Sequence, residues 1–283
     1  MKAAVLGSPV SHSLSPTLHG AAYAALGLSG WTYEAIECDE AGLAGLIRGC
    51  GPEWAGLSLT MPLKQAVVPL LDTAEPVVTQ VGAANTVVFA GGSASGFNTD
   101  VAGIATALTE AGAAAAEPAL VLGAGATARS ALAALHALGL RQATVAVRDP
   151  ARAAGMLDAA GRLGMAITLA PFDEPGVGSG YLLISTVPAG AADSYAERIS
   201  GAGPGPAAVL DVVYHPWPTR LAVAARKSGA LVIGGFEMLL HQAARQVELM
   251  TGRPAPTEAM RAAGAAEIKR RVAGSGRGTA GPG

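Results

Sequence analysis

The stretch from residue 119 to 128, Ala-Leu-Val-Leu-Gly-Ala-Gly-Ala-Thr-Ala, constrains the fold more than any other part of the chain. Its apolar start predicts a buried strand, its glycines a tight turn, and its alanine-rich end a helix. Gly123 and Gly125 allow a pyrophosphate to approach the backbone, and Ala128 takes the third position of G-x-G-x-x-G/A, where a small residue lets helix pack on strand. The stretch predicts a dinucleotide-binding turn with helix-start amides facing the phosphates. A glycine-rich turn without a nucleotide also fits it.

The residues after this turn continue the pattern. A helix is expected over 126–138, Gly139 is a typical helix-ending residue, and a β-branched strand follows at 142–147. These elements complete a βαβ unit of about 30 residues. Further strands are expected at 166–169, 181–186, 209–213 and 231–233. The repeated alternation predicts a mostly parallel sheet with helices on both faces.

The N-terminal part shows a similar alternation. Strands are expected at 3–6, 31–37, 55–59 and up to 89, and helices up to 26, over 40–48 and over 101–111. Ser15 is placed to cap the first helix with Pro16 at its first position, and Asp100 to cap the helix over 101–111. Two last helices, over 236–250 and 257–272, have no strand after them and are expected to pack back on the first domain.

Two residues at the end of the strand over 55–59 indicate a ligand site. Thr60 and Lys64 follow that strand, and in open α/β sheets ligands bind at the carboxyl ends of strands. A surface lysine at a helix start is the alternative for Lys64, although a cation is mildly unfavourable in a first helical turn. Asn85 is interpreted as a turn residue when it is taken alone.

Composition bounds the class of protein. With 283 residues, 51% of them apolar and 14% charged, the chain is expected to form one large or two ordinary globular domains. Its net charge of −2 argues against a nucleic-acid surface, and no uninterrupted apolar run reaches the length of about 20 residues that spans a membrane. The two cysteines and the short apolar N-terminus favour a cytoplasmic protein. Residues 273–283 are expected to form a flexible tail.

Seven motifs, in one order from residue 3 to about residue 272, carry a resemblance to a known family. They are Ser11-His-Ser-Leu-Ser-Pro16, Leu59-Thr-Met-Pro-Leu-Lys64, Gly82-Ala-Ala-Asn-Thr86, Asn98-Thr-Asp-Val-Ala-Gly103, Gly123-Ala-Gly-Ala-Thr-Ala128, Asp211-Val-Val-Tyr214 and Gly235-Phe-Glu-Met-Leu-Leu-His-Gln242. The sequence resembles the shikimate dehydrogenase family. That family catalyses the reversible NADP-linked reduction of 3-dehydroshikimate to shikimate in aromatic amino-acid biosynthesis.

The resemblance implies an α/β fold of two domains with the active site in the cleft between them. The N-terminal α/β substrate-binding domain would comprise residues 1–101, completed by the C-terminal helices in 236–272. A Rossmann-type, doubly wound NADP-binding domain would comprise residues 102–235. Shikimate or 3-dehydroshikimate is the expected small-molecule partner, and a monomer and a homodimer are both admissible.

The same resemblance implies substrate ligands. Ser13 and Ser15 would donate hydrogen bonds to the substrate carboxylate, which requires two donors side by side. Tyr214 would close the pocket near that carboxylate. The ring hydroxyls would be bound by Thr60, Asn85, Asp100 and Gln242.

Lys64 and Asp100 would form the catalytic pair. During reduction a proton must reach the ketone oxygen as hydride reaches the carbon, and a lysine ammonium can donate that proton and stabilise the developing charge. Asp100 beside it would favour the charged form of the ammonium. Oxidation would then be easier at high pH.

The cofactor site would combine the glycine turn with residues from later strands. Its implied members are Gly123, Ala124, Gly125, Ala126, Thr127, Val187, Val213, Gly235 and Met238, the last lying toward the nicotinamide. Arg148 ends the second strand of the βαβ unit and Arg152 follows one helical turn later, so two guanidiniums could hold the 2′-phosphate of NADP. Asp149 could instead bind a ribose and favour NAD, but a helix cap with Pro150 behind it is the preferred interpretation.

Two residues depart from the family pattern: Ser58 and His215 each stand where the family commonly has Asn. Neither departure removes a catalytic group. The alternatives are a quinate/shikimate or aminoshikimate dehydrogenase using NAD or NADP, and a non-catalytic sensor of shikimate-like acids. No metal is expected, because the spacing of His12, His19, His136 and His241 is not that of a metal site.

Overall fold

The computed structural model describes residues 1–283 apart from 115, 201–204 and 276–283. The chain forms two compact units. The first contains Met1–Thr73, Asn85–Gly96 and the described residues from Ala243 onward. The second contains Ala74–Ala84 and Phe97–Gln242. No helix in the described part of the chain combines the length and the hydropathy needed to cross a membrane.

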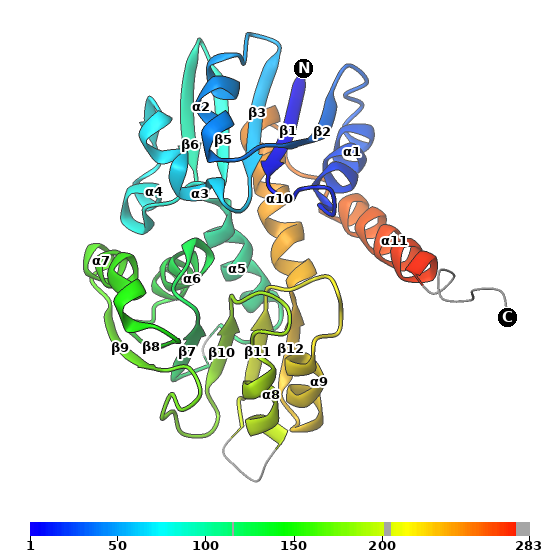
Figure 1. The fold of residues 1–283 in the computed structure, drawn as a ribbon. Coiled ribbons are helices and arrows are strands. Elements are labelled where there is room, and N and C mark those ends of the chain that lie inside the picture. The colour runs from blue at the N-terminus through cyan, green and yellow to red at the C-terminus, as the bar shows by residue number, and fades with distance from the viewer. Residues whose placement is uncertain (115, 201–204, 276–283) are drawn as a thin grey trace, which may run out of the picture. The chain divides into compact units, whose positions relative to one another are not determined.

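The first sheet has six strands in the order β2-β1-β3-β5-β6-β4 (Figure 1). The strands are β1 (Lys2–Gly7), β2 (Thr32–Glu37), β3 (Trp54–Leu59), β4 (Thr73–Ala74), β5 (Thr86–Ala90) and β6 (Ser93–Phe97). β1 is parallel to β2 and β3, whereas β5 is antiparallel to β3. Gly91 and Gly92, both with positive φ, form the turn between β5 and β6. This sheet is therefore mixed, and strand–helix alternation does not describe its second half.

The helices of the first unit follow their local sequence signals. They are α1 (Ser15–Ala25), α2 (Glu40–Arg48), the short α3 (Leu63–Ala66), the 3-10 turn η1 (Val68–Leu70), α11 (Thr257–Ser275) and the C-terminal part of α10 (Gly235–Thr251). Asp39 caps α2 by accepting a hydrogen bond of 2.9 Å from the amide of Gly42. The predicted cap at Ser15 is wrong, because Ser15 is already the first helical residue and Leu14 holds the cap position.

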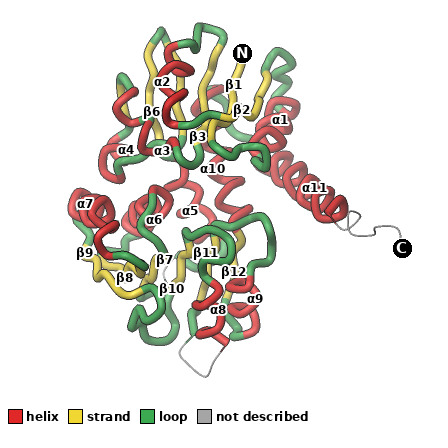
Figure 2. Tube along the Cα trace, viewed as in Figure 1, coloured by secondary structure: helices red, strands yellow, loops and turns green. Residues whose placement is uncertain are grey.

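The second sheet has the order β12-β11-β10-β7-β8-β9, and all its pairs are parallel. Its strands are β7 (Ala119–Leu122), β8 (Gln142–Val147), β9 (Ala166–Pro171), β10 (Leu182–Ser185), β11 (Ala208–Asp211) and β12 (Leu231–Gly234). The helices of this unit are α4 (Pro76–Val81), α5 (Thr99–Glu110), α6 (Ala126–Ala137), the 3-10 turn η2 (Pro150–Ala153), α7 (Ala154–Leu163), α8 (Asp193–Ser200) and α9 (Arg220–Lys227). Figure 2 shows α8 and α9 beside β10, β11 and β12.

Alternate residues of the second sheet enter two separate cores. On β7, Val121 packs with residues of α5, α6 and α7, whereas Leu120 and Leu122 pack with residues of α8 and α9. The same alternation holds on β10. Leu182 and Ile184 lie on one face of the sheet, and Leu183 lies on the opposite face. A parallel sheet with both faces buried is the doubly wound arrangement that the repeated strand–helix alternation predicts. That prediction is confirmed for this unit.

The compact units differ from the predicted domain ranges in three places. α4 belongs to the second unit because it packs on α6 and α7, and Arg162 donates a hydrogen bond of 2.8 Å to the carbonyl of Gln80. The start of α5, including Asp100, and α10 up to Gln242 also lie in the second unit.

α11 continues to Ser275, beyond the predicted start of a tail, and the rest of that predicted tail lies outside the described residues.

Candidate active site

One edge of the first sheet gathers three chain segments that carry predicted site residues. Leu6 on β1 is aligned with Leu59 on β3, and Ser58 is paired with Thr86 on β5. Because β5 is antiparallel to β3, the start of β5 lies at the edge where β1 and β3 end. The amide of Ser8 donates a hydrogen bond of 3.0 Å to the carbonyl of Met61, which joins the loops after β1 and β3.

The loop after β1 presents the two serines. The backbone amide of Ser15, the first residue of α1, donates a hydrogen bond of 3.2 Å to Oγ of Ser13. A hydroxyl that accepts one hydrogen bond keeps its own O–H as a donor. The bond ties Ser13 to the start of α1.

Thr60 and Lys64 occupy the turn after β3. The amide of Thr60 donates a hydrogen bond of 2.9 Å to the carbonyl of Leu6, and its carbonyl accepts one of 2.9 Å from the amide of Leu63. These bonds begin α3, whose second residue is the half-buried Lys64. Lys64 thus follows the carboxyl end of a central strand, as predicted.

Asn85 stands just before β5 and is buried. Its carbonyl accepts a hydrogen bond of 2.7 Å from the amide of Leu59, and its side-chain Oδ1 accepts one of 2.9 Å from the hydroxyl of Thr86. The first bond ties Asn85 to the end of β3, next to Thr60, and the second joins it to the first residue of β5. A buried amide in this position can bind a ligand hydroxyl as donor and acceptor.

Gln246 on α10 is a buried residue that the sequence motifs did not single out. Its Nε2 donates a hydrogen bond of 3.0 Å to Thr86 Oγ1, and its Oε1 accepts one of 2.9 Å from Ser58. Oε1 also lies 3.2 Å from Nε2 of His19 on α1. Gln246 follows Gln242 by four residues and so by one helical turn, which is the signal that could have indicated it. We refer to Gln246, Ser58, Thr86 and His19 as the Gln246 network.

The histidine of this network is fully buried and neutral. The ring of His19 stacks on Tyr33 with centroids 3.9 Å apart, and its Nδ1 lies 3.4 Å from the hydroxyl of Tyr23. Burial lowers the pKa of His19 to about 4, against a hydrogen bond with Gln246 that raises it. These contacts agree with the structural role that the sequence assigned to His19.

The second unit carries Asp100 and Gln242 on two helices that pack closely. The prediction that Asp100 caps α5 is wrong. The helix begins at Thr99, and Asp100 lies in its first turn. An acidic side chain there is stabilised by the helix dipole. A Cβ at Gly103 would lie 2.7 Å from the carbonyl of Met238, so only glycine permits this approach of α5 to α10.

Gln242 is oriented by its own surroundings in the second unit. The hydroxyl of Thr99, the neighbour of Asp100, donates a hydrogen bond of 3.4 Å to its Oε1. Its Nε2 donates a hydrogen bond of 3.1 Å to the carbonyl of Leu239. The amide of Gln242 is therefore held beside the start of α5.

The glycine turn has the features expected of a phosphate-binding turn. Gly123 has φ +104°, and a Cβ there would lie 2.9 Å from Oγ1 of Thr186. Gly125 is exposed, a Cβ there would meet nothing within 4 Å, and it caps α6 without a side-chain hydrogen bond. The amides of Ala126 and Thr127 therefore begin a helix at an open backbone, while Ala128 is fully buried as predicted. These residues fit a dinucleotide pyrophosphate.

Asp211 organises the loop that bears Val213 and Tyr214. Its Oδ1 accepts a hydrogen bond of 3.3 Å from the amide of Val213, and its Oδ2 accepts one of 2.6 Å from the hydroxyl of Thr219, which caps α9. Burial raises the pKa of the Asp211 carboxyl. A Cβ at Gly235 would collide with the carbonyl of Val212, so the glycine allows α10 to start against this loop.

Arg148 and Asp149 lie at the end of β8. Arg148 lines a pocket of about 500 Å³ whose other walls are Val147, Pro150, Leu169, Ala170, Pro171, Phe172 and Asp173. Arg152 is exposed on η2 and is not part of that lining. The Asp149 carboxylate accepts a hydrogen bond of 3.0 Å from the amide of Ala151, so the predicted cap is confirmed. The β9 residues that line this pocket match no sequence motif, so the sequence did not indicate them.

Comparison with known proteins decides the family. The sequence model of the shikimate dehydrogenase substrate binding domain matches residues 5–87, and that of the shikimate 5′-dehydrogenase C-terminal domain matches residues 235–263. A relative from Moorella thermoacetica, shikimate dehydrogenase (NADP(+)), is 36% identical over 91% of this chain and 90% of its own length. The chain belongs to the shikimate dehydrogenase family.

Solved structures of the shikimate dehydrogenase family have the same fold. Shikimate dehydrogenase of Mycobacterium tuberculosis is 45% identical, with a TM-score of 0.85, over 94% of this chain and 99% of that one. Shikimate 5-dehydrogenase of Thermus thermophilus, in complex with NADP(H) and shikimate, is 34% identical with a TM-score of 0.82 over the same shares of the two chains.

The site residues implied by the shikimate dehydrogenase family divide between the two units. The first unit carries Ser13, Ser15, Thr60, Lys64 and Asn85 at one sheet edge. The second unit carries Asp100, Gln242, Tyr214 and the residues implied for the cofactor. Val187, which is buried, follows β10 and would lie 3.2 Å from a Cβ at Gly123, so it belongs with the glycine turn.

One group of potential metal ligands occurs within the described part of the chain. A ligand atom from each of Glu110, Glu237 and His241 lies within 4.8 Å of the other two. His241 and Glu110 are 131 residues apart in sequence, so spacing gave no sign of the group. A hydrogen bond of 3.0 Å between His241 Nε2 and Glu110 Oε2 accounts for their proximity without an ion.

Proposed function

We propose that this protein catalyses the reversible, NADPH-dependent reduction of 3-dehydroshikimate to shikimate. The observation that carries the proposal is the sheet edge of the first unit, where a lysine stands among hydroxyl and amide groups after β1, after β3 and before β5. The relatives named shikimate dehydrogenase (NADP(+)), which match most of the chain, support it.

The substrate is an anionic ring with several hydroxyls, and each group has a partner among the residues of the site. We assign the carboxylate to the hydroxyls of Ser13 and Ser15, two residues that are joined by the bond from the backbone amide of Ser15 to Oγ of Ser13. We assign the ring hydroxyls to Thr60, Asn85, Asp100 and Gln242. Sites that pair each hydroxyl reject analogues lacking one, because a buried polar group would then lose its partner.

Lys64 acts as the proton donor in the direction of reduction. NADPH, when bound, supplies a hydride to the ketone carbon. Lys64 donates a proton to the ketone oxygen as negative charge develops there, and the ammonium stabilises that charge before transfer. Asp100 favours the charged form of the ammonium. In the direction of oxidation the lysine amine accepts the hydroxyl proton, so oxidation is favoured at higher pH.

We assign the 2′-phosphate of NADP to Arg148. A guanidinium at the end of the second strand is the feature that accommodates this phosphate in dinucleotide-binding folds. The Asp149 carboxylate accepts the capping bond from Ala151 through Oδ1, and the relatives named shikimate dehydrogenase (NADP(+)) support NADP over NAD. Arg152 has a lesser part, since it does not line the pocket beside Arg148.

We also propose that the enzyme works in the cytoplasm as a monomer or homodimer, without a nucleic-acid partner. Both cysteines, Cys38 and Cys50, are unpaired, which is typical of a reducing compartment.

The decisive experiment follows the absorbance of reduced nicotinamide with purified protein. Shikimate and quinate are each paired with NADP and with NAD. We expect fast reduction of NADP with shikimate and slow turnover with the other pairs. Preference for NAD with quinate would make the protein a quinate dehydrogenase and would assign Asp149 to binding of the NAD ribose. No turnover with any pair, together with shikimate binding by calorimetry, would make it a sensor.

A further inference from the structure

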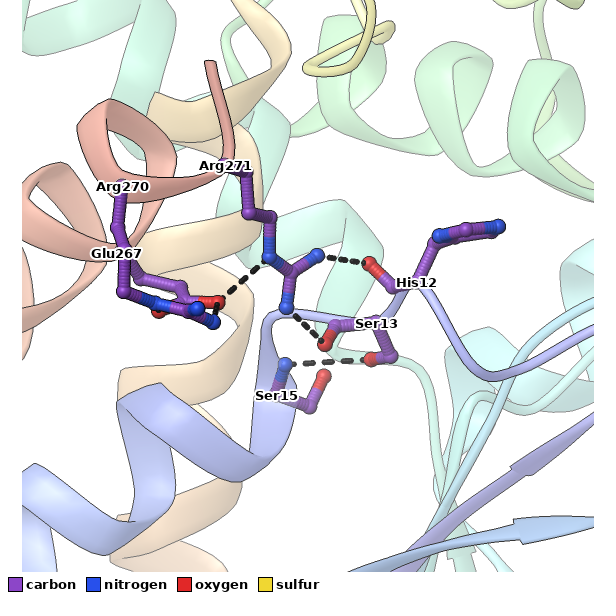
Figure 3. A network of polar contacts seen from close by, with 6 residues as sticks. All are labelled: His12, Ser13, Ser15, Glu267, Arg270 and Arg271. Carbon is purple, nitrogen blue, oxygen red and sulfur yellow. Dashed lines mark hydrogen bonds and ion pairs between the residues drawn. The ribbon is translucent and has the colours of Figure 1, made fainter. Parts of the chain in front are cut away.

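An arginine of the last helix reaches the loop that carries the two serines. Nη1 of Arg271 donates a hydrogen bond of 2.7 Å to the carbonyl of His12, and Nη2 donates one of 3.3 Å to the carbonyl of Ser13 (Figure 3). Arg271 lies near the end of α11, which packs along α1 in the same unit. The contact therefore joins residues that are 259 and 258 positions apart in the chain.

Glu267 directs the guanidinium toward this loop. Its Oε1 accepts a hydrogen bond of 2.6 Å from Nε of Arg271, which leaves both Nη atoms facing the loop. The side chain of Glu267 is 14% exposed, and its hydrogen bonds with Arg270 and Arg271 lower the pKa of the carboxyl to about 2. Glu267 therefore remains a carboxylate at any pH at which the enzyme would work. A planar guanidinium can hold one carboxylate and two carbonyls together, because its donors point in fixed directions.

The contact matters for the substrate carboxylate. Backbone carbonyl oxygens carry partial negative charge, and two of them in the serine loop would oppose an anion bound there. Arg271 binds both carbonyls and brings a positive charge to that loop. Ser13 Oγ also accepts a hydrogen bond from the backbone amide of Ser15. Hydrogen bonds therefore fix Ser13 both at its carbonyl and at its hydroxyl.

We propose that Arg271, oriented by Glu267, is a positioning residue for the binding of the substrate carboxylate by Ser13 and Ser15. The inference rests on the proposed function and deepens it. Arg271 binds the loop backbone at His12 and Ser13, so it acts through Ser13. The family models match no residue beyond 263 at this end of the chain, so neither Arg271 nor Glu267 lies in a matched segment.

The test compares Arg271→Ala with Arg270→Ala. Arg270 is the matched control because it also pairs with Glu267, through bonds of 2.7 Å from Nε and Nη2, and its side chain is 75% exposed. Steady-state kinetics are measured for both variants with shikimate and NADP. We expect Arg271→Ala to raise KM for shikimate about tenfold or more, with kcat and KM for NADP within about twofold of wild type. Arg270→Ala should leave all three near wild type.

A second variant and a second ligand separate positioning from folding. Arg271→Lys keeps the charge but lacks the fork that reaches both carbonyls, so its KM for shikimate should lie between those of wild type and Arg271→Ala. A competitive inhibitor whose carboxylate is replaced by a hydroxymethyl group should bind wild type and Arg271→Ala alike. Thermal melting of all variants reports whether the fold is retained.

The inference is overturned if Arg271→Ala has the same KM for shikimate as Arg270→Ala. It is also overturned if kcat falls while KM stays constant, or if the uncharged inhibitor loses as much affinity as shikimate does. Each of these results leaves the proposed function standing, because the wild-type enzyme turns over shikimate in the same assay. Failure of the wild-type reaction itself would instead contradict the proposed function.

Discussion

At the scale of single residues, Lys64 shows how much its place in the fold adds to its chemistry. Lysines are common on surfaces, but Lys64 is half-buried in a four-residue helix at the carboxyl end of β3. The same sheet edge carries Thr60 and Asn85. A flexible ammonium in these surroundings suits proton transfer to a ligand oxygen.

Replacing Lys64 tests that assignment. We expect Lys64→Ala to lower kcat by about 10² or more while KM for shikimate changes much less, because the ammonium acts mainly on charge that develops in the transition state. The control is Lys227→Ala, which removes an exposed lysine of α9. Turnover of Lys64→Ala close to that of the control would remove Lys64 from the mechanism.

A second prediction at this scale concerns cofactor choice. Arg148→Ala should raise KM for NADP by about tenfold or more and leave KM for NAD nearly constant, because a charge-assisted pair with the 2′-phosphate is lost only for NADP. Arg152→Ala is the matched control, since Arg152 is exposed and does not line the pocket beside Arg148. Equal effects of the two variants on NADP kinetics would contradict the assignment of Arg148.

At the scale of elements, α10 is the helix that supports the sheet edge of the first unit. Through Gln246 it reaches Ser58 on β3, Thr86 on β5 and His19 on α1. Thr86 in turn donates to Oδ1 of Asn85, so the network continues to a proposed substrate ligand. Buried polar groups linked in this way rigidify a core because each depends on its partners.

Removing the amide of Gln246 tests the network. Gln246→Leu should lower the free energy of unfolding by about 1–3 kcal/mol, because buried partners lose their hydrogen bonds. Urea denaturation at neutral pH measures the change. Arg245→Ala, on the same helix and half-exposed, should change the free energy by less than about 0.5 kcal/mol. A loss no larger than that of the control would mean that the network contributes nothing to stability.

At the scale of the whole molecule, His19 links stability to pH. The pKa of this histidine is lowered by burial to about 4, from an ordinary value of 6.5. The unfolded chain therefore binds one more proton than the folded protein between these values, so stability is complete above about pH 6.5 and is lost as the pH falls toward 4. A shift of this size corresponds to about 3 kcal/mol.

The measurement is urea unfolding at about pH 7 and at about pH 4.5, where about three quarters of this loss should have developed. His19→Gln should reduce the acid-induced loss of unfolding free energy, whatever its effect on stability at neutral pH. His136→Gln replaces a histidine on α6 outside this network and should leave the acid-induced loss as in wild type. An unchanged loss in His19→Gln would show that other groups cause it.

Features that depend on residues close together in the sequence were predicted, whereas features that depend on contacts between distant residues were not. The glycine turn, the cap at Asp149 and the helices on both faces of the second sheet follow from local sequence patterns, and they were predicted. The cap assigned to Ser15 was wrong because α1 begins one residue earlier than predicted, with Leu14 at the cap position. The reversal of β5 and the packing of α4 on α6 and α7 were not predicted, since both depend on distant partners.

The sequence by itself determined the family, the doubly wound sheet and the identity of the groups for chemistry, because motifs and hydrophobic periodicity are written in local order. Only the tertiary structure decided which groups share an edge or a network. Gln246 meets Ser58 at a separation of 188 residues, and Arg271 meets His12 at 259. Contacts over such separations are set by how helices and sheets pack, and no local pattern records them.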